Sequence, residues 1–469
     1  MTYHSKRKQR IYAAIPYPFK ILLATVYGAQ QRRARYSTVF RETWRDLQAS
    51  QRSPADAIKQ YERETLGAFL ADVLPRTRYY REHPVYRVDA ELGELPVLSK
   101  STVQAQLPRF YRDGSGDGPC HWGHTSGTTG QALVFPISED CFQREYAFRV
   151  LHYSWGGVDF AGRDRHAFCS GHPVAHHDRR RPPFWVHDVA NNWLLLSSYN
   201  LTEQNLPAYV RKLEKYNPVM LGGYPSSLYL LALAYRKYGR GTLRPRAVFT
   251  ASETLFDRQR EVMREAFGAP VFNWYGNSEL CGHITECEAG RLHVRHEHSY
   301  VEVLDDRDAP CAPGETGRLV ATGFHNRLFP LIRYDVGDRV TLSAEAKCPC
   351  GRTGRLIERI EGRQEDYVAT PDGRLVGRLD HLFKDTLHVR EAQIVQSCIE
   401  AIVLRIVKSP DYGAGDEEEI VRQARLRLGS TIRIVFEYVE FIERSPSGKY
   451  RFIVSKLDQQ ALLSNLSTP

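Results

Sequence analysis

Short apolar runs alternate with helical patterns through the middle of the chain. Between residues 140 and 260 the runs HAFCSG, VMLGGYP and RAVFTASE are separated by segments with helical spacing, one of them at Leu228–Tyr238. Strands separated by helices predict a mostly parallel sheet with crossover helices. Such a sheet binds ligands at the carboxyl ends of its strands. The small polar residues that follow the strands in GGYPSSL and TASETL are therefore candidate ligand-binding positions.

The segments on either side of this region have other patterns. Before it, apolar residues recur with the period of a helix: Leu66, Phe69, Leu70, Val73 and Leu74. Glu94 to Leu107 predicts a loop and then a helix capped by Ser99 or Ser101. After it, strand-like AIVLRIV and IRIVFEYVEFI surround an acidic helix at Gly415 to Leu428, which predicts a small α+β unit.

We therefore predict an α/β protein in three parts. A helical region over 1–90 packs on the main body, a large domain occupies 91–362, and a small α+β domain occupies 363–469. The segment EGRQEDY is the expected linker between the last two parts.

The first 40 residues combine basic clusters with an apolar run. KRKQR and RRARY flank an apolar region that Pro16, Pro18 and Lys20 interrupt, leaving Ile21 to Ala29. That run is too short to span a bilayer, and the interruptions argue against a signal peptide. One interpretation is an interfacial segment held on an anionic leaflet by its basic flanks, a peripheral membrane contact. The interpretation that we favour is a helix packed on the main body.

Composition and charge narrow the possible partners. The 469 residues are 42% hydrophobic and 25% charged, enough for about two to four domains. The net charge of +9 suits nucleic acid, an anionic membrane face or an anionic substrate such as ATP. Apart from the N-terminus and Arg179–Arg181 the basic residues are dispersed, and no nucleic-acid motif is present, so we expect no nucleic-acid partner. The nine dispersed cysteines favour a reducing compartment and hence a cytoplasmic protein.

The segment HTSGTTGQ, from His124 to Gln131, is the first candidate for binding chemistry. Its glycines allow the backbone N–H groups to converge, and its hydroxyls add small donors, a combination that suits a triphosphate. The apolar strand ALVFPIS follows it. A flexible linker or a tight hairpin turn is the alternative, and the segment lacks the Gly-Lys-Ser/Thr of a Walker loop.

Two carboxylates lie close to the ends of later apolar runs. In FNWYGNSELCG an aromatic strand ends at Tyr275-Gly276, and Glu279 follows, placed to hold magnesium unless it caps a following helix. In LIRYDVGDRV, Asp338 follows a glycine at a predicted turn, where it can accept hydrogen bonds from a ribose diol or stabilise the turn itself. The intervening GETGRLVATG predicts a hairpin.

The cysteines predict a separate metal site. Cys287 and His293 lie on either side of a Gly290 turn, and Cys348-Pro-Cys350-Gly brings two further thiols together. Three thiolates and an imidazole would close a tetrahedral, structural zinc site. The alternative is unpaired thiols in a turn, and His283, Cys281 and His296 are spare donors.

Five motifs in order amount to a resemblance. HTSGTTG, YGNSE, RYDVGD, EGRQEDY and SPSGKYRF follow one another as in the adenylate-forming enzymes. ECEAGRLH, CPCGRTGR and PLIRYDVGD are most similar to the phenylacetate–CoA ligase-like branch, which includes homologues from capsular-polysaccharide loci. The resemblance covers about residues 90 to 455 and departs from the family at Gln131, Asn277 and Glu365.

The resemblance implies a fold, a nucleotide site and a mobile domain. It implies a large domain with parallel-rich sheets and a small mobile α+β domain. ATP and AMP would contact Thr125, Ser126, Gly127, Thr128, Thr129, Gly130, Ser252, Glu253, Asn273, Tyr275, Gly276, Asn277, Ser278, Asp338 and Arg363. By resemblance Tyr275 contacts adenine, Glu279 reaches Mg²⁺, and Lys449 is the catalytic lysine. Glu365 is the hinge, and the acid would be bound by His172, Gly223, Tyr224, Ala251 and Trp274.

The implied activity has two half-reactions. A carboxylic acid reacts with ATP to form an acyl-adenylate, and CoA then takes the acyl group as a thioester. The alternative acceptor is an amine or a glycan, and a nucleotide-binding regulator without turnover is a third class. The implied cofactors are ATP, Mg²⁺, CoA and a structural Zn²⁺. The identity of the acid stays open, as does the choice between monomer and homodimer; the cationic stretch SGHPVAHHDRRRPPFWVHD faces either a polar acid or solvent.

Overall fold

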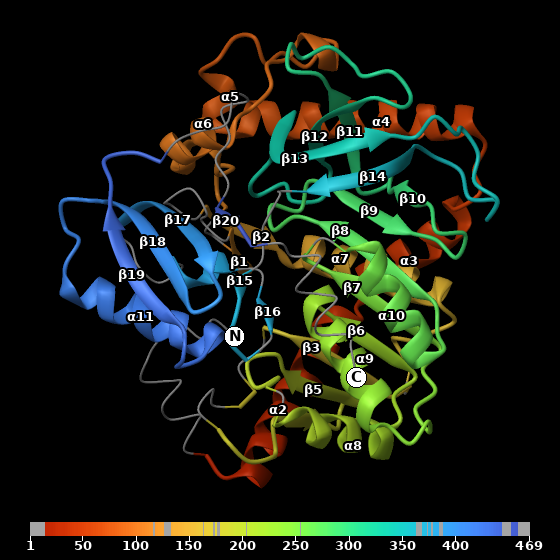
Figure 1. Cartoon of the computed structure of the whole chain (residues 1–469). Coiled ribbons are helices and arrows are strands. Elements are labelled where there is room, and N and C mark those ends of the chain that lie inside the picture. The colour runs from red at the N-terminus through yellow and green to blue at the C-terminus, as the bar shows by residue number, and fades with distance from the viewer. Residues whose placement is uncertain are drawn as a thin grey trace.

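The computed structural model describes most of the chain (Figure 1). The described residues are 15–115, 118–125, 133–162, 164–171, 174–175, 179–202, 204–253, 255–362, 368–372, 374–376, 379–383, 388–442 and 452–457. They form a large mixed sheet with its helices and, near the C-terminus, a second, smaller sheet.

Twelve strands form the main sheet, in the order β11-β12-β13-β14-β10-β9-β8-β7-β6-β3-β5-β4. Their bounds are β3 His166–Ser170, β4 Trp185–Asp188, β5 Trp193–Ser197, β6 Met220–Gly223, β7 Ala247–Ala251, β8 Val271–Gly276, β9 His283–Glu286, β10 Leu292–Val294, β11 Ser299–Leu304, β12 Thr316–Gly323, β13 Tyr334–Leu342 and β14 Leu356–Gly362.

One half of this sheet is parallel. Strands β5, β3, β6, β7 and β8 pair in parallel, and the predicted strands HAFCSG, VMLGGYP and RAVFTASE are β3, β6 and β7. Helices α8 (Leu206–Tyr216), α9 (Pro225–Tyr238) and α10 (Asp257–Phe267) cover one face. Helices α3 (Thr38–Ser50) and α7 (Glu139–Trp155) cover the other. Successive side chains of a strand point to opposite faces of the sheet, and this alternation produces a hydrophobic core on each face. In β7, Val248 packs against α8, α9 and α10, and Phe249 packs against α3 and α7.

The other half of the sheet is antiparallel and carries the N-terminal helical region. Helix α4 (Ala55–Val73) buries Phe69, Leu70 and Val73 against β11, β12 and β13. The predicted hairpin GETGRLVATG is instead one eight-residue strand, β12, which pairs with both β11 and β13. The turn lies before the strand, where Gly314 has a φ of 89°.

The remaining N-terminal elements are mostly helical. They are α2 Tyr17–Arg35, η1 Leu74–Arg76, α5 Arg78–Arg81, η2 Leu92–Glu94, α6 Lys100–Ala105 and η3 Leu107–Phe110. The helix predicted after Ser99 is α6, and Ser99 Oγ accepts a hydrogen bond from Thr102 N at 3.1 Å, as a helix cap does. Over the described stretches of the chain, no helix has the length and apolar character needed to cross a bilayer.

The C-terminal sheet has the order β19-β18-β17-β20 and packs on helix α11 (Ala414–Leu428). Its strands are β17 Val389–Cys398, β18 Ala401–Lys408, β19 Arg433–Tyr438 and β20 Ile453–Ser455. The predicted α+β pattern is present, although β19 ends at Tyr438, before the end of IRIVFEYVEFI. In the sequence, β15 (Val368–Ala369), β16 (Leu375–Val376) and η4 (Leu379–Phe383) come after the last strand of the main sheet and before the first strand of the C-terminal sheet. These elements confirm the predicted α/β class, while the three domain boundaries stay a prediction.

Candidate functional site

The predicted phosphate loop joins a two-stranded hairpin. Strands β1 (Cys120–His124) and β2 (Val134–Ser138) pair in antiparallel register, with His124 opposite Val134. Buried Thr125 closes the base of the loop, because its N–H donates to Leu133 O at 3.0 Å and its Oγ1 accepts from Leu133 N at 2.9 Å. Five further predicted nucleotide contacts lie outside the described residues: Ser126, Gly127, Thr128, Thr129 and Gly130.

Tyr275 and Asp338, predicted to contact adenine and ribose, lie side by side. Tyr275 Oη donates a hydrogen bond to Asp338 Oδ2 at 2.6 Å. Strands β8 and β13 are four steps apart in the sheet, so a flat sheet would separate them by about 19 Å. The contact therefore requires the sheet to curl between them, and the curl brings two distant motifs into one site.

Asp338 does not lie in a turn, as predicted, but within strand β13. The pairing with β12 shifts between Arg318 and Val320, so three residues of β13 stand opposite Leu319. Gly337, at a φ of 86°, permits this bulge immediately before Asp338. The glycine that suggested a turn in the sequence marks a bulge in a continuous strand.

Glu279 is a nearly buried carboxylate, 6% exposed, in the segment between β8 and β9. Tyr334 Oη donates to its Oε1 at 3.0 Å, and Lys100 Nζ lies 3.8 Å from the same oxygen. The alternative role, capping a following helix, is wrong because strand β9 follows. The sequence analysis did not identify Lys100 and Tyr334 as neighbours of Glu279. Leu98 forms a β-bridge with Tyr334, the first residue of β13, and this bridge brings helix α6, which begins at Lys100, close to Glu279.

Several other predicted nucleotide contacts have structural partners in the fold. Glu253 Oε2 accepts from Ser226 N at 3.1 Å, at the positive end of helix α9. Asn277 Oδ1 accepts from Cys281 N at 3.0 Å and closes the turn that contains Ser278. Ser252, with a φ of 74°, follows β7, and Gly276 ends β8.

Asn273 belongs to a network that crosses from β8 to β9. Its backbone N–H donates to Glu286 Oε2 at 2.7 Å, and its Oδ1 accepts from Thr250 Oγ1 at 3.1 Å. Arg260 Nη2 lies 3.0 Å from the same Glu286 oxygen. Burial raises the pKa of Glu286, while the Arg260 charge opposes that rise. Glu286, the residue before Cys287, thus holds the strand that carries Tyr275.

The predicted acid-binding residues lie at the carboxyl ends of parallel strands. Gly223 ends β6 at a φ of 154°, and a Cβ there would overlap Cys169 O, so only glycine fits. Tyr224 follows as the residue before helix α9, while Ala251 of β7 stands opposite Trp274 of β8. The remaining predicted site residues, His172, Arg363, Glu365 and Lys449, lie outside the described residues.

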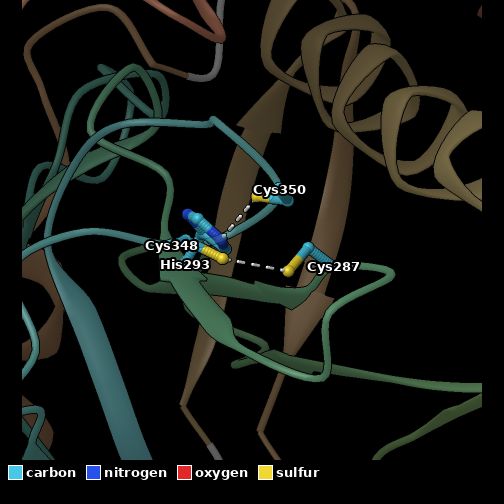
Figure 2. Close-up of side chains that lie close together, drawn as sticks. All are labelled: Cys287, His293, Cys348 and Cys350. Carbon is cyan, nitrogen blue, oxygen red and sulfur yellow. Dashed lines mark hydrogen bonds between the residues drawn. The ribbon is translucent and has the colours of Figure 1, made fainter.

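The predicted metal ligands Cys287, His293, Cys348 and Cys350 converge (Figure 2). Their candidate ligand atoms all lie within 4.8 Å of one another. The Sγ atoms of Cys287 and Cys348 are 3.6 Å apart, and Cys350 Sγ is 3.5 Å from His293 Nε2. Two tight turns hold the cysteines, with Gly290 N donating to Cys287 O and Gly351 N to Cys348 O, both glycines at positive φ.

Burial raises the pKa of the Cys287 and Cys348 thiols and lowers that of His293 to about 4. The pKa of the Cys350 thiol is lowered, because burial raises it less than the hydrogen bonds from Arg352 and Cys348 lower it. A bound divalent cation reverses the effect on the thiols, because thiolates are its ligands. The spare donors have other partners: Cys281 contacts Asn277, His296 lies beside Glu297, and His283 lies near Glu145 and His298.

Solved structures with the same architecture are CoA ligases. 2-Hydroxyisobutyryl-CoA ligase in complex with 2-HIB-AMP and CoA has a TM-score of 0.56 and 18% identity, covering 90% of this chain and 94% of that chain. The same ligase in its postadenylation state has a TM-score of 0.51 over the same shares, at 18% identity. At these identities the likeness shows the fold, which is that of this CoA ligase.

The sequence is also similar to known proteins. Residues 368–456 match the family described as the CapK C-terminal domain. Protein CapK of Staphylococcus aureus is 27% identical over 379 residues, covering 78% of this chain and 81% of CapK. Phenylacetate-coenzyme A ligase of Thermus thermophilus is 32% identical over 166 residues, 34% of this chain and 37% of that ligase. The chain is therefore similar to CapK over most of its length and to a phenylacetate-CoA ligase over about a third of it, and it has the fold of the solved CoA ligase.

Proposed function

We propose that this protein activates a carboxylic acid with ATP and transfers the acyl group to CoA. The observation that carries the proposal is a double contact between the segment from β8 to β9 and strand β13: Tyr275 donates a hydrogen bond to Asp338, and Tyr334 donates one to Glu279. The described relatives support it, since one solved ligase of this fold holds an acyl-adenylate together with CoA.

The first half-reaction follows from these groups. A carboxylate oxygen of the acid attacks the α-phosphorus of ATP, the bond to the β-phosphate breaks, and pyrophosphate leaves. Catalysis of this step is mainly positioning and charge neutralisation. Glu279 would hold Mg²⁺, for which a carboxylate oxygen is the preferred ligand, and the bound ion would neutralise charge on the phosphates. Asp338 would accept hydrogen bonds from the ribose diol, with Tyr275 beside it against the adenine.

The second half-reaction releases AMP. The CoA thiolate attacks the acyl carbon, and the bond from that carbon to the AMP oxygen breaks. Lys449, which lies outside the described residues, would neutralise the α-phosphate only in the first step. It would then move away as the small domain turns about the linker at Glu365.

The direct test is exchange of labelled pyrophosphate into ATP, run with Mg²⁺ across a panel of acids. Exchange with at least one acid is expected, and Lys449→Ala should abolish it while leaving the reaction of a preformed acyl-adenylate with CoA intact. No exchange with any acid would refute the activity. Equal slowing of both half-reactions by Lys449→Ala would refute the domain movement.

A second acceptor is favoured by one observation. The alternative acceptor is an amine or a glycan, and it is suggested by the capsular-polysaccharide likeness of the motifs together with the match of residues 368–456 to the CapK C-terminal domain. Thioester formation when CoA is added supports the ligase. An acyl-adenylate that is stable to CoA but captured by hydroxylamine or an amino sugar supports the alternative.

We also propose that Cys287, His293, Cys348 and Cys350 hold a structural zinc ion. Three sulfurs and one imidazole nitrogen match the ligand types and number of a closed tetrahedral site. The two glycine turns fix the ligands before any metal binds. Zinc would fasten the β9–β10 turn to the segment before β14 and hold this end of the sheet.

A further inference from the structure

Helix α2 turns its large apolar side chains toward solvent. Phe19, Leu22, Leu23 and Val26 are 59%, 57%, 48% and 48% exposed. Their spacing of three, four and seven residues puts them on one face of the helix. A contiguous exposed apolar face of this kind marks an interaction site on a folded protein.

The side of α2 that packs on the protein is the less apolar one. It buries Lys20 and Gly28, and Thr25 Oγ1 accepts from Val189 N at 3.2 Å. A Cβ at position 28 would overlap the Asp188 carboxylate, so the close packing requires glycine. This contact fixes the rotation of the helix and keeps the apolar face outward. The arrangement is the reverse of an ordinary surface helix, whose apolar face packs inward.

A basic loop adjoins the N-terminal turns of this helix. Arg179 lies six residues before β4, the strand against which α2 packs, and its charge adds to burial in lowering the pKa of Lys20. Arg180 and Arg181, next along the loop, are exposed, as is Arg33 in the last turn of α2. The sequence separates these arginines from α2 by about 150 residues, and only the fold brings them together.

We propose that the outward face of α2 and the Arg179–Arg181 loop dock together on an anionic lipid surface. Apolar side chains would enter the boundary between headgroups and acyl chains, and the arginines would pair with acidic headgroups. A second copy fits this face less well, because a two-fold contact between α2 helices would bring two basic loops toward each other.

The test is co-sedimentation of the full chain with vesicles of phosphatidylcholine alone or with 30% phosphatidylglycerol, at low and at physiological salt. The wild type should bind the anionic vesicles, and more weakly at higher salt. Leu22→Ser/Leu23→Ser should lower the partition coefficient at least tenfold. Arg179→Gln/Arg180→Gln/Arg181→Gln should lower it about 100-fold on anionic vesicles only.

Matched controls separate docking from general stickiness. Val88→Ser/Val435→Ser removes two exposed apolar side chains on other surfaces and should bind like the wild type. Thermal melting should be unchanged in every variant, because all the altered side chains are partly or fully exposed. No binding to anionic vesicles, or equal binding by the Leu22/Leu23 variant, would overturn the proposal. A dimer in light scattering that dissociates in that variant would overturn it in favour of a chain–chain interface.

Discussion

The Cys/His cluster and the candidate nucleotide site are built in opposite ways. The cluster takes its ligands from two short turns, Cys287–Gly290 and Cys348–Gly351, and from the strand that follows the first turn. The nucleotide site collects Glu279, Tyr275 and Asp338 from two strands and a loop, and depends on the curl of the sheet. Local turns build each half of the cluster, and the pairing of β10 with β14 joins the two halves, whereas the nucleotide site depends on contacts between strands that are not neighbours in the sheet.

This difference has a functional reading. A site held by tight turns is rigid and suits a structural ion, which needs fixed ligands and no open position. A site assembled from separate segments can change when one segment moves, as a reaction with two half-reactions requires. Damage to the cluster should therefore appear as lost stability, and damage to the nucleotide site as lost turnover.

The largest effect is expected at the cluster. Cys350→Ser should release about one zinc per chain and lower the melting temperature by roughly 10 °C, a few kcal/mol for a large domain. Metal analysis and thermal melting measure both. Cys398→Ser, at an exposed cysteine outside the cluster, is the matched control and should change neither. A wild type that keeps its melting temperature after zinc is removed would show that the cluster does not hold a structural zinc ion.

Glu279→Gln should separate activity from stability. The amide keeps the shape but loses the charge that would bind Mg²⁺, so pyrophosphate exchange should fall about 100-fold to 1,000-fold, within the several kcal/mol that a catalytic metal supplies. The melting temperature should change little. Untouched exchange would show that Glu279 does not bind the ion.

A double-mutant cycle on Tyr275→Phe and Asp338→Asn tests whether the contact that the curl of the sheet creates between these two side chains contributes to ATP binding. Because the two side chains share one hydrogen bond at 2.6 Å, their effects on the KM for ATP should not add, with a coupling of about 1 kcal/mol. Each single variant should raise KM about fivefold to tenfold. Additive effects would mean that the two groups act independently on the nucleotide.

His166 provides the smallest effect and a contrast to His293. Both are buried histidines whose pKa burial lowers to about 4, but neither ring nitrogen of His166 has a partner among the described residues. In the unfolded chain His166 takes up a proton below about pH 6.5, but in the folded protein it stays neutral down to about pH 4. The free energy of unfolding therefore decreases as the pH is lowered from 6.5 to about 4. His166→Phe should therefore stabilise the protein at pH 5 by about 1 kcal/mol, whereas His293→Phe should destabilise it. Urea unfolding at pH 5 and pH 8 measures both.

The parallel half of the fold followed from the sequence because strands and helices alternate there with clear periods. The Cys/His cluster was also predictable, since each half of it is a short motif with its own turn. Tyr275 and Glu279 were singled out because the first lies at the end of one apolar strand and the second follows shortly after it. Each of these signals is local.

What the sequence did not give depends on contacts between distant segments. Asp338 was expected in a turn because Gly337 precedes it, but pairing with both neighbouring strands makes that glycine a bulge. Lys100 and Tyr334 reach Glu279 only because residue 98 pairs beside β13, and nothing near either residue in the sequence announces that contact. Likewise, the outward rotation of α2 depends on the fit of Gly28 against Asp188.

Glu286 gives the two contrasted sites a common member. Its carboxylate holds the backbone of β8 through Asn273, two residues before Tyr275, and its own neighbour in the chain is Cys287. Any free energy that couples metal binding to nucleotide binding through this residue acts equally in both directions, by thermodynamic linkage. If the bound ion raises the affinity for ATP by some factor, then bound ATP raises the affinity for the ion by the same factor. Zinc would then be hardest to extract with a chelator while the enzyme is holding its nucleotide.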